Sequence, residues 1–232
     1  MSRVLLKLSG EALAGGDEQF AHHKVTVLAR VLKQAVQEGT QVGVVCGAGN
    51  IFRARQANLE VLGRVTADQV GMLATVMNAA VLRDYLRAEG QAARILTPRD
   101  QVPLARAFAR DEALDLLDAG QVLIFAGGTG NPYFTTDSAA ALRALEIGAD
   151  VLLKGTQVDG VYDKDPHQYA DAQRFEHLTY DEVLARKLRV MDLTAVTLCA
   201  EGDLSMRVFD ISDPENLLKV LAGEDIGTRI TR

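Results

Sequence analysis

Short apolar runs alternate along the chain with longer stretches in which apolar residues recur every three or four positions. Runs of four or five mostly apolar residues predict β-strands, and helical spacing predicts α-helices. The runs are Val4–Leu8, Val42–Cys46, Ala93–Leu96, Val122–Ala126, Asp150–Lys154 and Met206–Phe209. The helical stretches are Leu28–Val36, Val70–Val81, Asp111–Asp118, Asp137–Ile147 and a last one after Asp213-Pro214 that ends at Gly223. This alternation predicts an α/β fold, a three-layer sandwich around a largely parallel central sheet.

Local signals predict where some elements begin or turn. Thr66 with Gln69, and Thr179 with Glu182, have the spacing of a capping box, which predicts a helix start at each threonine. Asp159-Gly160 predicts a tight hairpin. Residues 1–232 contain no repeat, low-complexity tract or linker, so we expect one domain. The helix after Thr66 should end near Gly90, with an apolar face formed by Val70, Leu73, Ala74, Met77 and Val81.

Charge and composition narrow the class of protein. The 232 residues include 25 Lys and Arg against 31 Asp and Glu, a formal net charge of -6, and no Trp. An acidic chain with few aromatic residues lacks the basic surface and stacking platforms of a nucleic-acid binder. Cys46 and Cys199 lie far apart and form no CxxC pair, which argues against a disulfide scaffold or a Cys-rich metal site. The cysteine usage fits a reducing cytoplasm.

No apolar run has the length of a membrane span or the pattern of an export signal. A span needs roughly 18 apolar residues, and the longest runs, such as Val122–Ala126, are far shorter. Lys7 interrupts the first apolar run and Glu11 follows it, whereas an export signal has an unbroken apolar core. We therefore expect a cytoplasmic protein whose first run is a strand.

Three predicted strands end in glycine-rich turns that suit phosphate binding. The turns are Ser9-Gly10, Gly47–Asn50 and Gly127–Gly130, and Lys7 and Lys154 also lie at strand ends. In parallel sheets ligands bind at the carboxyl ends of strands, where helix N-termini present N–H groups to anions. One such turn is most often only a tight connection, but three turns together with two lysines favour a nucleotide site.

Other common catalytic motifs do not fit the chain. It has no GxxxxGK[ST] sequence, which excludes a Walker-type kinase, and no GxSxG hydrolase elbow. Gly47-Ala48-Gly49 begins like a dinucleotide-binding turn, but Phe52 stands where the third glycine belongs, so an oxidoreductase fits poorly. The four histidines show no metal-ligand spacing, and His22-His23 reads as a solvated helix start.

Six segments, in order along nearly the whole chain, resemble the bacterial UMP kinase family. They are Lys7–Glu11, Gly47–Arg53, Asp68–Asn78, Thr129–Asp137, Val158–Tyr162 and Val190–Leu193, of which Thr129–Asp137 is the most specific. That family has the amino-acid-kinase fold and not a P-loop. The resemblance implies transfer of the γ-phosphoryl group of ATP to UMP, giving UDP and ADP, on the path to CTP. It also implies an acceptor-side lobe of roughly residues 1–150 and an ATP-side lobe of roughly 151–232.

The resemblance implies a set of binding residues for each nucleotide. The residues implied for ATP are Lys7, Leu8, Ser9, Gly10, Gly49 and Arg53, with Thr156, Tyr162 and Asp165 near the adenosine. Those implied for UMP are Ala48, Asp68, Thr129, Gly130, Asn131, Pro132, Tyr133, Phe134, Thr135 and Thr136. Asp68 would accept hydrogen bonds from the ribose hydroxyls, because an ionised carboxylate only accepts.

Phosphoryl transfer requires that two nucleotides be held in line while negative charge is neutralised. Lys7 and Arg53 would clamp the transferring group, Lys154 is a further candidate, and Mg²⁺ would come with ATP. Asp137 or Asp192 would orient a lysine or Mg²⁺. For both carboxylates a plain helix cap is an open alternative.

The chain departs from the family pattern at two places. Ala48 replaces a glycine, which would crowd a ligand-facing backbone unless its φ is negative. Ala54-Arg55 replaces a glycine after Arg53, and Arg55 would either contact phosphate or point to solvent. The resemblance further implies a homohexamer, with the helix Val70–Met77 as a candidate interface, and regulation by a GTP activator and a UTP inhibitor. The loop Gly15–Phe20, which corresponds to a segment linked to GTP activation, matches only loosely.

Two other functions stay open on the same fold. One is a kinase that phosphorylates a carboxylate or carbamate, against which the long polar segment Thr129–Asp137 argues. The other is a non-catalytic storage or sensor protein. Retention of Lys7, Arg53 and Asp68 argues against it, because a binding protein has no need of a cationic clamp.

Overall fold

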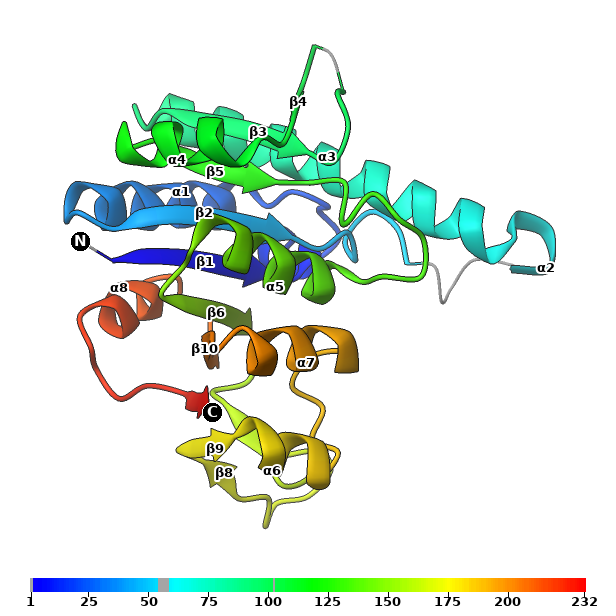
Figure 1. Ribbon diagram of the computed structural model, residues 1–232, viewed down its shortest axis with the longest axis vertical. Coiled ribbons are helices and arrows are strands. Elements are labelled where there is room, and N and C mark those ends of the chain that lie inside the picture. The colour runs from blue at the N-terminus through cyan, green and yellow to red at the C-terminus, as the bar shows by residue number, and fades with distance from the viewer. Residues whose placement is uncertain (1, 54–58, 102) are drawn as a thin grey trace.

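A computed structural model describes residues 2–53, 59–101 and 103–232 (Figure 1). The strands are β1 (Arg3–Leu8), β2 (Gln41–Cys46), β3 (Ala93–Thr97), β4 (Arg106–Ala107), β5 (Val122–Phe125), β6 (Val151–Thr156), β7 (Val161–Tyr162), β8 (Arg174–Phe175), β9 (His177–Thr179), β10 (Ser205–Asp210) and β11 (Thr228–Thr231). The helices are η1 (Gly10–Leu13), a single 3₁₀ turn, and α1 (His22–Gln37), α2 (Leu59–Leu62), α3 (Arg64–Ala88), α4 (Arg110–Asp118), α5 (Thr136–Ile147), α6 (Tyr180–Ala185), α7 (Leu193–Glu201) and α8 (Asn216–Leu221).

The central sheet is largely parallel, as the alternation of elements predicts. Within the described residues, nine strands pair in the order β4-β3-β5-β2-β1-β6-β10-β11-β9. Neighbours from β4 to β10 are parallel; β11 is antiparallel to β10, and β9 pairs parallel with β11. The carboxyl ends of seven strands therefore meet at one edge of the sheet.

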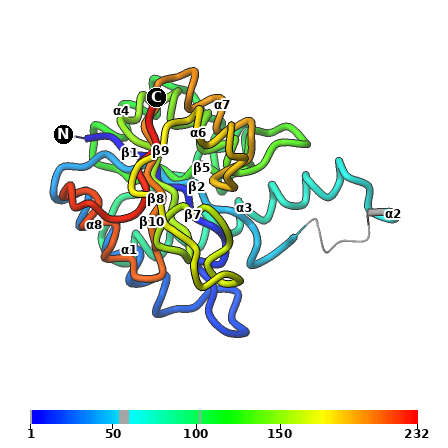
Figure 2. Tube along the Cα trace, turned by 90° about the horizontal axis from the view of Figure 1, so that it is seen from below, coloured from blue at the N-terminus to red at the C-terminus, as the bar shows by residue number. Residues whose placement is uncertain are grey.

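Helices cover both faces of the sheet, which makes the predicted three layers (Figure 2). On one face α1, α3 and α8 bury residues such as Leu28, Leu82 and Leu217 against the strands. On the other face α4, α5, α6 and α7 bury residues such as Leu117 and Ala144. Both cysteines are buried and free.

Three local predictions are wrong, the first of which is that Lys154 ends its strand, because β6 continues to Thr156. The helix predicted from Thr66 begins at Arg64, because Gly63 turns the chain with a φ of 71° and its carbonyl accepts from Ala67 N at 3.0 Å. Asp159-Gly160 does not join a hairpin, since β6 and β7 belong to different sheets. The capping box of Thr179 and Glu182 is present at the start of α6, and His22 and His23 are exposed at the start of α1.

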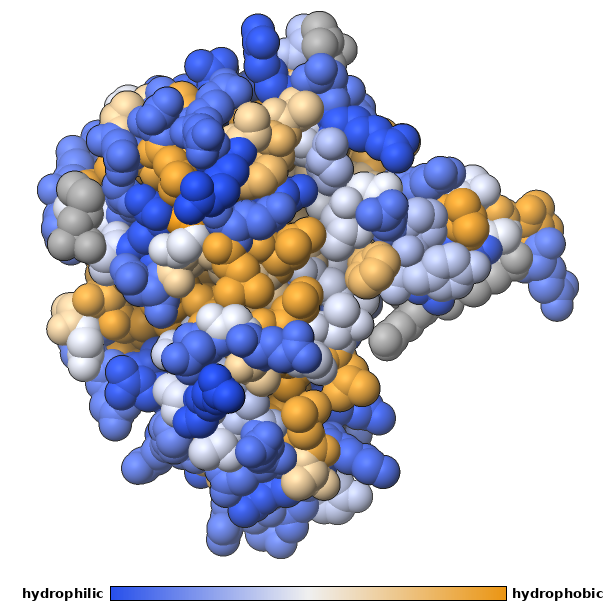
Figure 3. Space-filling model, viewed as in Figure 1, coloured by the Kyte–Doolittle hydropathy of each residue, from blue (hydrophilic) through white to orange (hydrophobic). Residues whose placement is uncertain are grey.

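Helix α3 extends beyond the body of the molecule and carries α2 at its far end (Figure 1). Leu73 and Met77, expected on its buried face, are 55% and 52% exposed, because the face with Ala74, Asn78 and Leu82 packs inward. In the space-filling view this arm shows apolar surface (Figure 3). An 18-residue window of this 25-residue helix has the hydropathy of a membrane span, contrary to expectation, and 39% of that window is buried. Core helices of globular proteins reach the same values, so this match carries little weight.

Candidate active site

The first two glycine turns lie against each other at the carboxyl edge of the sheet. Gly47 N donates to Leu8 O at 2.8 Å, so the end of β2 is bonded to the end of β1. A Cβ atom at Gly10 would lie 2.7 Å from Gly49 N, which leaves no room for a side chain. Gly10 is therefore required for the two turns to pack backbone to backbone.

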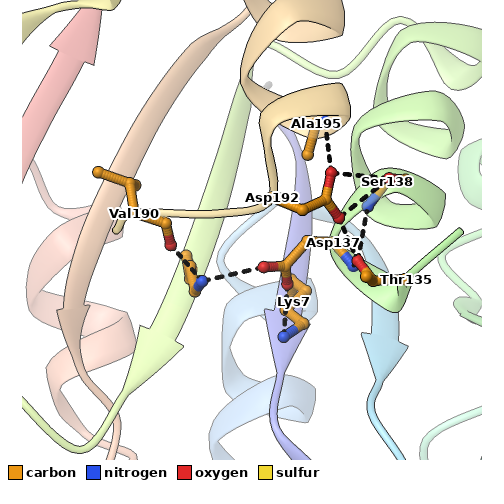
Figure 4. Close-up of polar contacts among 8 residues, drawn as sticks. Lys7, Thr135, Asp137, Ser138, Val190, Asp192 and Ala195 are labelled. Carbon is orange, nitrogen blue, oxygen red and sulfur yellow. Dashed lines mark hydrogen bonds and ion pairs between the residues drawn. The ribbon is translucent and has the colours of Figure 1, made fainter. Parts of the chain in front are cut away.

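Two lysines and one aspartate form an ion cluster beside these turns (Figure 4). Lys7 and Lys154 are paired in register on the parallel strands β1 and β6. Asp137, in the first turn of α5, lies between them, with Oδ1 2.6 Å from Lys7 Nζ and Oδ2 3.1 Å from Lys154 Nζ. The three side chains are only 11%, 16% and 14% exposed in the order Lys7, Lys154 and Asp137. Two cations against one anion leave this cluster with a net positive charge, which favours an anionic ligand.

The environment of the cluster shifts two pKa values downward. Burial tends to raise the pKa of Asp137, but the charges of Lys7 and Lys154 outweigh it and hold the pKa below its usual 3.8. Burial lowers the pKa of Lys154 below 10.5, against the opposing attraction of Asp137. Asp137 is therefore a carboxylate at neutral pH and not a general acid.

Asp137 does not cap helix α5, so that alternative is wrong. Thr135 is the N-cap residue, and its hydroxyl accepts from Asp137 N at 3.0 Å and from Ser138 N at 3.4 Å. The Asp137 carboxylate is left to contact the two lysines.

Asp192 does cap a helix, and it also ties two helices together. Its Oδ1 accepts from Ala195 N at 2.8 Å in the first turn of α7. The same carboxylate accepts hydrogen bonds from the hydroxyls of Thr135 and of Ser138, the latter at 2.9 Å (Figure 4). The N-termini of α5 and α7 are thereby held side by side next to the ion cluster.

Arg53 is attached to the glycine turns from the solvent side. Its guanidinium forms an ion pair with Glu11 and donates from Nε to Gly49 O at 3.0 Å. Half of its side chain is exposed, which leaves it accessible to a ligand. Arg55 lies outside the described residues.

A cavity of about 180 Å³ brings together five of the residues expected to bind UMP. Ala48, Asp68, Phe134, Thr135 and Thr136 all line it. Ala48 has no positive φ, so its methyl group needs no strained backbone. The other residues expected there, Thr129, Gly130, Asn131, Pro132 and Tyr133, do not line this cavity, although they belong to the same loop.

Asp68 fastens that loop to helix α3. Its Oδ2 lies 2.8 Å from Arg64 Nε and accepts from Tyr133 N, also at 2.8 Å. The Arg64 guanidinium stacks over the Tyr133 ring at 5.1 Å, and Tyr133 has a positive φ of 72°. A bulky residue held at positive φ marks a locally strained loop, which Asp68 and Arg64 hold in place.

A second, larger cavity of about 590 Å³ contains the residues expected at the adenosine. Thr156, Tyr162 and Asp165 line it together with Lys154, so the cavity reaches the ion cluster. Of the other residues expected to bind ATP, Ser9 lines a separate cavity of about 220 Å³. Neither of the two cavities described above is lined by Lys7, Leu8, Gly10, Gly49 or Arg53.

Sequence reasoning missed several side chains that support the site, among them Glu11, Arg64 and Asn78. Glu11 and Asn78 fall within segments that carry the family resemblance, yet nothing local indicates their partners. Arg64 precedes Asp68 by four residues on one helix, a spacing that does predict an ion pair. The buried thiols of Cys46 and Cys199 have pKa values raised to about 12 by burial, which excludes both as nucleophiles at neutral pH.

Comparison with known proteins identifies the family of this chain. The amino acid kinase family matches residues 2–210. A uridylate kinase of Xanthomonas oryzae pv. oryzae is 49% identical over 98% of this chain and 95% of its own length. A uridylate kinase of Psychrobacter sp. is 48% identical over 99% of this chain and 96% of its own length. The crystal structure of UMP kinase from Bacillus anthracis superposes with a TM-score of 0.95 at 35% identity, covering 99% of this chain and 96% of that one.

The fold and the family resemblance that the sequence predicts are confirmed by these matches. The chain belongs to the amino acid kinase family and, within it, to the uridylate kinases.

Proposed function

We propose that the protein transfers the γ-phosphoryl group of ATP to UMP, giving UDP and ADP, in the synthesis of pyrimidine nucleotides. The observation that carries the proposal is that the ion cluster is connected to both cavities. Lys154 of the cluster lines the larger cavity. Thr135 and Thr136, which line the smaller one, directly precede Asp137. Two nucleotides bound in these cavities would meet at the cluster.

The ATP-side lobe, roughly residues 151–232, supplies the adenosine end of this arrangement. Thr156, Tyr162 and Asp165 would contact the nucleoside. The phosphates would extend toward Lys7, Leu8, Ser9 and Gly10, with Gly49 and Arg53 facing them from the second turn. These turns offer backbone N–H groups and cations, which are the groups that bind phosphate.

The acceptor-side lobe, roughly residues 1–150, would hold UMP against Ala48, Asp68 and the loop Thr129–Thr136. The polar loop supplies hydroxyls and backbone groups for the base and the phosphate. Asp68 is the carboxylate that lines this cavity, and it would accept from the ribose.

Catalysis would consist of positioning and electrostatic stabilisation, since phosphoryl transfer requires little covalent chemistry from the protein. Lys7, Lys154 and Arg53 would stabilise the charge on the transferring group. Asp137 would position the two lysines, which it already contacts. Asp192 would act through Thr135 and Ser138 by fixing the start of α5.

The donor set of the site fits a Mg²⁺ ion that arrives with ATP. Among the described residues, no group of three or more His, Cys, Asp or Glu side chains is placed to hold a metal ion. Mg²⁺ commonly keeps several waters and binds through substrate phosphates with one or two carboxylates. Bound to the nucleotide, the ion would neutralise phosphate charge, and Asp137 or Asp192 would be the carboxylate that holds it.

The family resemblance extends the proposal to assembly and regulation. The protein would act in the cytoplasm as a homohexamer, activated by GTP and inhibited by UTP. Exposed apolar side chains on α3, including Leu73 and Met77, support an assembly through that helix. A carboxylate or carbamate kinase and a non-catalytic storage protein are not favoured by the uridylate kinase relatives.

A coupled assay for ADP formation tests the function directly. UMP, CMP and dUMP are offered in turn as acceptors with ATP and Mg²⁺. We expect ADP to form rapidly with UMP and more slowly with the other two acceptors. Absence of ADP formation with UMP would refute the proposal, and nucleotide binding without turnover would favour the storage protein.

A further inference from the structure

Asn78 is a fully buried amide on helix α3, at 0% exposure, among apolar neighbours. Its Nδ2 donates to Gly47 O at 2.6 Å and to Asn50 Oδ1 at 2.8 Å. Gly47 is therefore held from both sides, by Leu8 O on β1 and by Asn78 on α3. Burying an amide in a helix core costs free energy, and these hydrogen bonds offset that cost. An apolar side chain would pack there without it, which suggests a role for the bonds themselves.

Asn50, at the end of the same turn, completes a reciprocal amide pair. Its Nδ2 donates to Asn78 Oδ1 at 3.0 Å and to Gln19 O at 2.9 Å. Both backbone carbonyls only accept, so each amide must present its nitrogen to one of them. The orientation of the pair is thus determined, and every polar atom of the Asn78 side chain has a partner.

We propose that Asn78 is a positioning residue that holds the Gly47–Asn50 turn in the shape that receives phosphate. The inference rests on the proposed function, in which Gly49 and Arg53 face ATP and Ala48 faces UMP. The turn has no room to adjust by itself, because Gly10 packs against Gly49 N and Glu11 against Gly49. A shift of Gly47 would therefore be passed to the residues on both sides of the transferring group.

The same helix also positions the third glycine turn. Thr75, one turn before Asn78 and 2% exposed, accepts from Gly127 N at 2.7 Å. One face of α3 therefore reaches two of the three turns and carries Asp68 as well. This arrangement explains why polar side chains occupy a helix face that otherwise packs on the sheet.

The substitution Asn78→Asp separates a positioning role from a general packing role. The new carboxyl group has nearly the shape of the amide, but when ionised it can only accept. It would face Gly47 O, which also only accepts, and no rotation of Asn50 relieves that contact. When protonated, the carboxyl can again donate one hydrogen bond, and burial favours this protonated form.

We expect the kcat/KM of Asn78→Asp to fall about tenfold to hundredfold at alkaline pH, the effect of one buried polar group left unsatisfied. Activity should recover toward the wild-type value as the pH is lowered, after division by the wild-type pH profile. Asn50→Ala, a milder change on a half-buried residue, should raise the ATP KM. The effects of Asn50→Ala and Asn78→Ala on the ATP KM should not be additive, because the two side chains form one hydrogen-bonded unit.

Gln91→Glu is the matched control. Gln91 is a buried amide whose Nε2 donates to two carbonyls, Ala92 O at 2.9 Å and Gly120 O at 2.8 Å. It lies just before β3, at the opposite edge of the sheet from the site. This variant should lose stability but keep the wild-type kcat and KM in the folded protein.

The possible outcomes distinguish a failure of the proposed kinase function from a failure of the positioning role of Asn78. An inactive wild-type enzyme would refute the proposed function, whatever the variants do. If the wild-type enzyme is active and Asn78→Asp keeps its kcat, its KM values and the wild-type pH profile, the inference is wrong. It is equally wrong if Asn78→Asp and Gln91→Glu lose activity only in proportion to the fraction unfolded.

Discussion

The two lysines of the site account for the buried carboxylate of Asp137, which balances charge and does not transfer a proton. Lys7 and Lys154 occupy paired positions on neighbouring parallel strands, so their like charges repel at short range. Asp137 balances one of the two charges and leaves a net positive charge, which in the proposed function would act on the phosphoryl group. The stability of the folded state should therefore depend on Asp137 more than on any surface acid.

We expect Asp137→Asn to lower the free energy of unfolding by about 3 kcal/mol at neutral pH, because breaking a buried ion pair leaves uncompensated charge. The folded-state pKa of Asp137 lies below 3.8, so its stabilisation is complete above pH 3.8 and is lost as the pH falls through the folded-state value. The difference between variant and wild type should thus be constant near neutrality and shrink in acid.

Urea unfolding across this pH range measures the difference. Asp171→Asn is the control, since Asp171 is 79% exposed and pairs with Lys164 at 2.6 Å. An exposed pair contributes about 0 to 1 kcal/mol. If the two substitutions cost the same, or if the Asp137→Asn difference does not change with pH, Asp137 does not hold the cluster together.

Asp68 should discriminate between ribose and deoxyribose in the acceptor. A hydrogen bond to a charged acceptor contributes roughly 1.5 to 3 kcal/mol, so its loss implies an effect of about tenfold to hundredfold. We expect Asp68→Asn to reduce kcat/KM for UMP by that factor with the ATP KM unchanged, and the unmodified enzyme to use dUMP poorly. Initial-rate kinetics with both acceptors provide the measurement.

The contacts of Asp68 offer a competing explanation, namely that the residue only holds the loop Thr129–Thr136 in place. Arg64 and Tyr133 N both bind Asp68 Oδ2 and so fix that loop to α3. Arg64→Lys, which keeps the charge but not the stacking over Tyr133, serves as the comparison for that role. Equal use of UMP and dUMP, or an Asp68→Asn variant changed only in melting temperature, would remove Asp68 from ribose recognition.

At the scale of elements, predictions from the sequence hold where the determinants are local. The ends of β1 and β2 and the glycine turns that follow β1, β2 and β5 are predicted correctly, because apolar runs and glycines identify them, whereas β6 extends two residues beyond the predicted end at Lys154. The predicted start of α3 at Thr66 is wrong, because the chain turns into the helix at Gly63. The exposed Leu73 and Met77 could not be predicted, since α3 is apolar on more than one side and only the docked sheet selects the buried face.

The contact between α5 and α7 is an element-scale feature that can be measured. Asp192 caps α7 and accepts from Ser138 at the start of α5. In a double-mutant cycle, Asp192→Ala and Ser138→Ala should be non-additive in unfolding free energy by about 0.5 to 3 kcal/mol, as expected for residues in one hydrogen-bond network.

A second double-mutant cycle, which combines Ser212→Ala with Asp192→Ala, is the control. Ser212 also donates to an aspartate, Asp210, at 2.8 Å, but it shares no partner with Asp192. These two substitutions should be additive within about 0.5 kcal/mol. If the Ser138 cycle is equally additive, the two helices are not coupled through Asp192.

At the scale of the whole molecule, the topology of the sheet assembles the site. Lys7 comes from β1, near the start of the chain, whereas Asp137 and Lys154 come from α5 and β6, which follow each other in the sequence. The sequence predicts that three glycine-rich turns and two lysines lie at one edge of the sheet, because parallel strands share that edge. It does not predict that Asp137 bridges the lysines or that Asn78 supports the second turn. Those contacts depend on how α5 and α3 dock, and no local pattern encodes that.

The exposed apolar residues of α2 and α3 lead to a prediction about assembly. Val61, Val65, Leu73 and Met77 are 84%, 44%, 55% and 52% exposed, a concentration on one projecting arm that is unusual for a free surface. Light scattering at micromolar concentration should report a mass several times the 25.0 kDa of the chain, sixfold if the family resemblance holds. Leu73→Glu combined with Met77→Glu should yield smaller species, because charges placed in an apolar contact must lose their water. Tyr169→Glu, at a side chain 50% exposed outside the arm, should leave the mass unchanged. A wild-type monomer, or a doubly substituted protein of unaltered mass and normal far-UV circular dichroism, would show that the arm is not an interface.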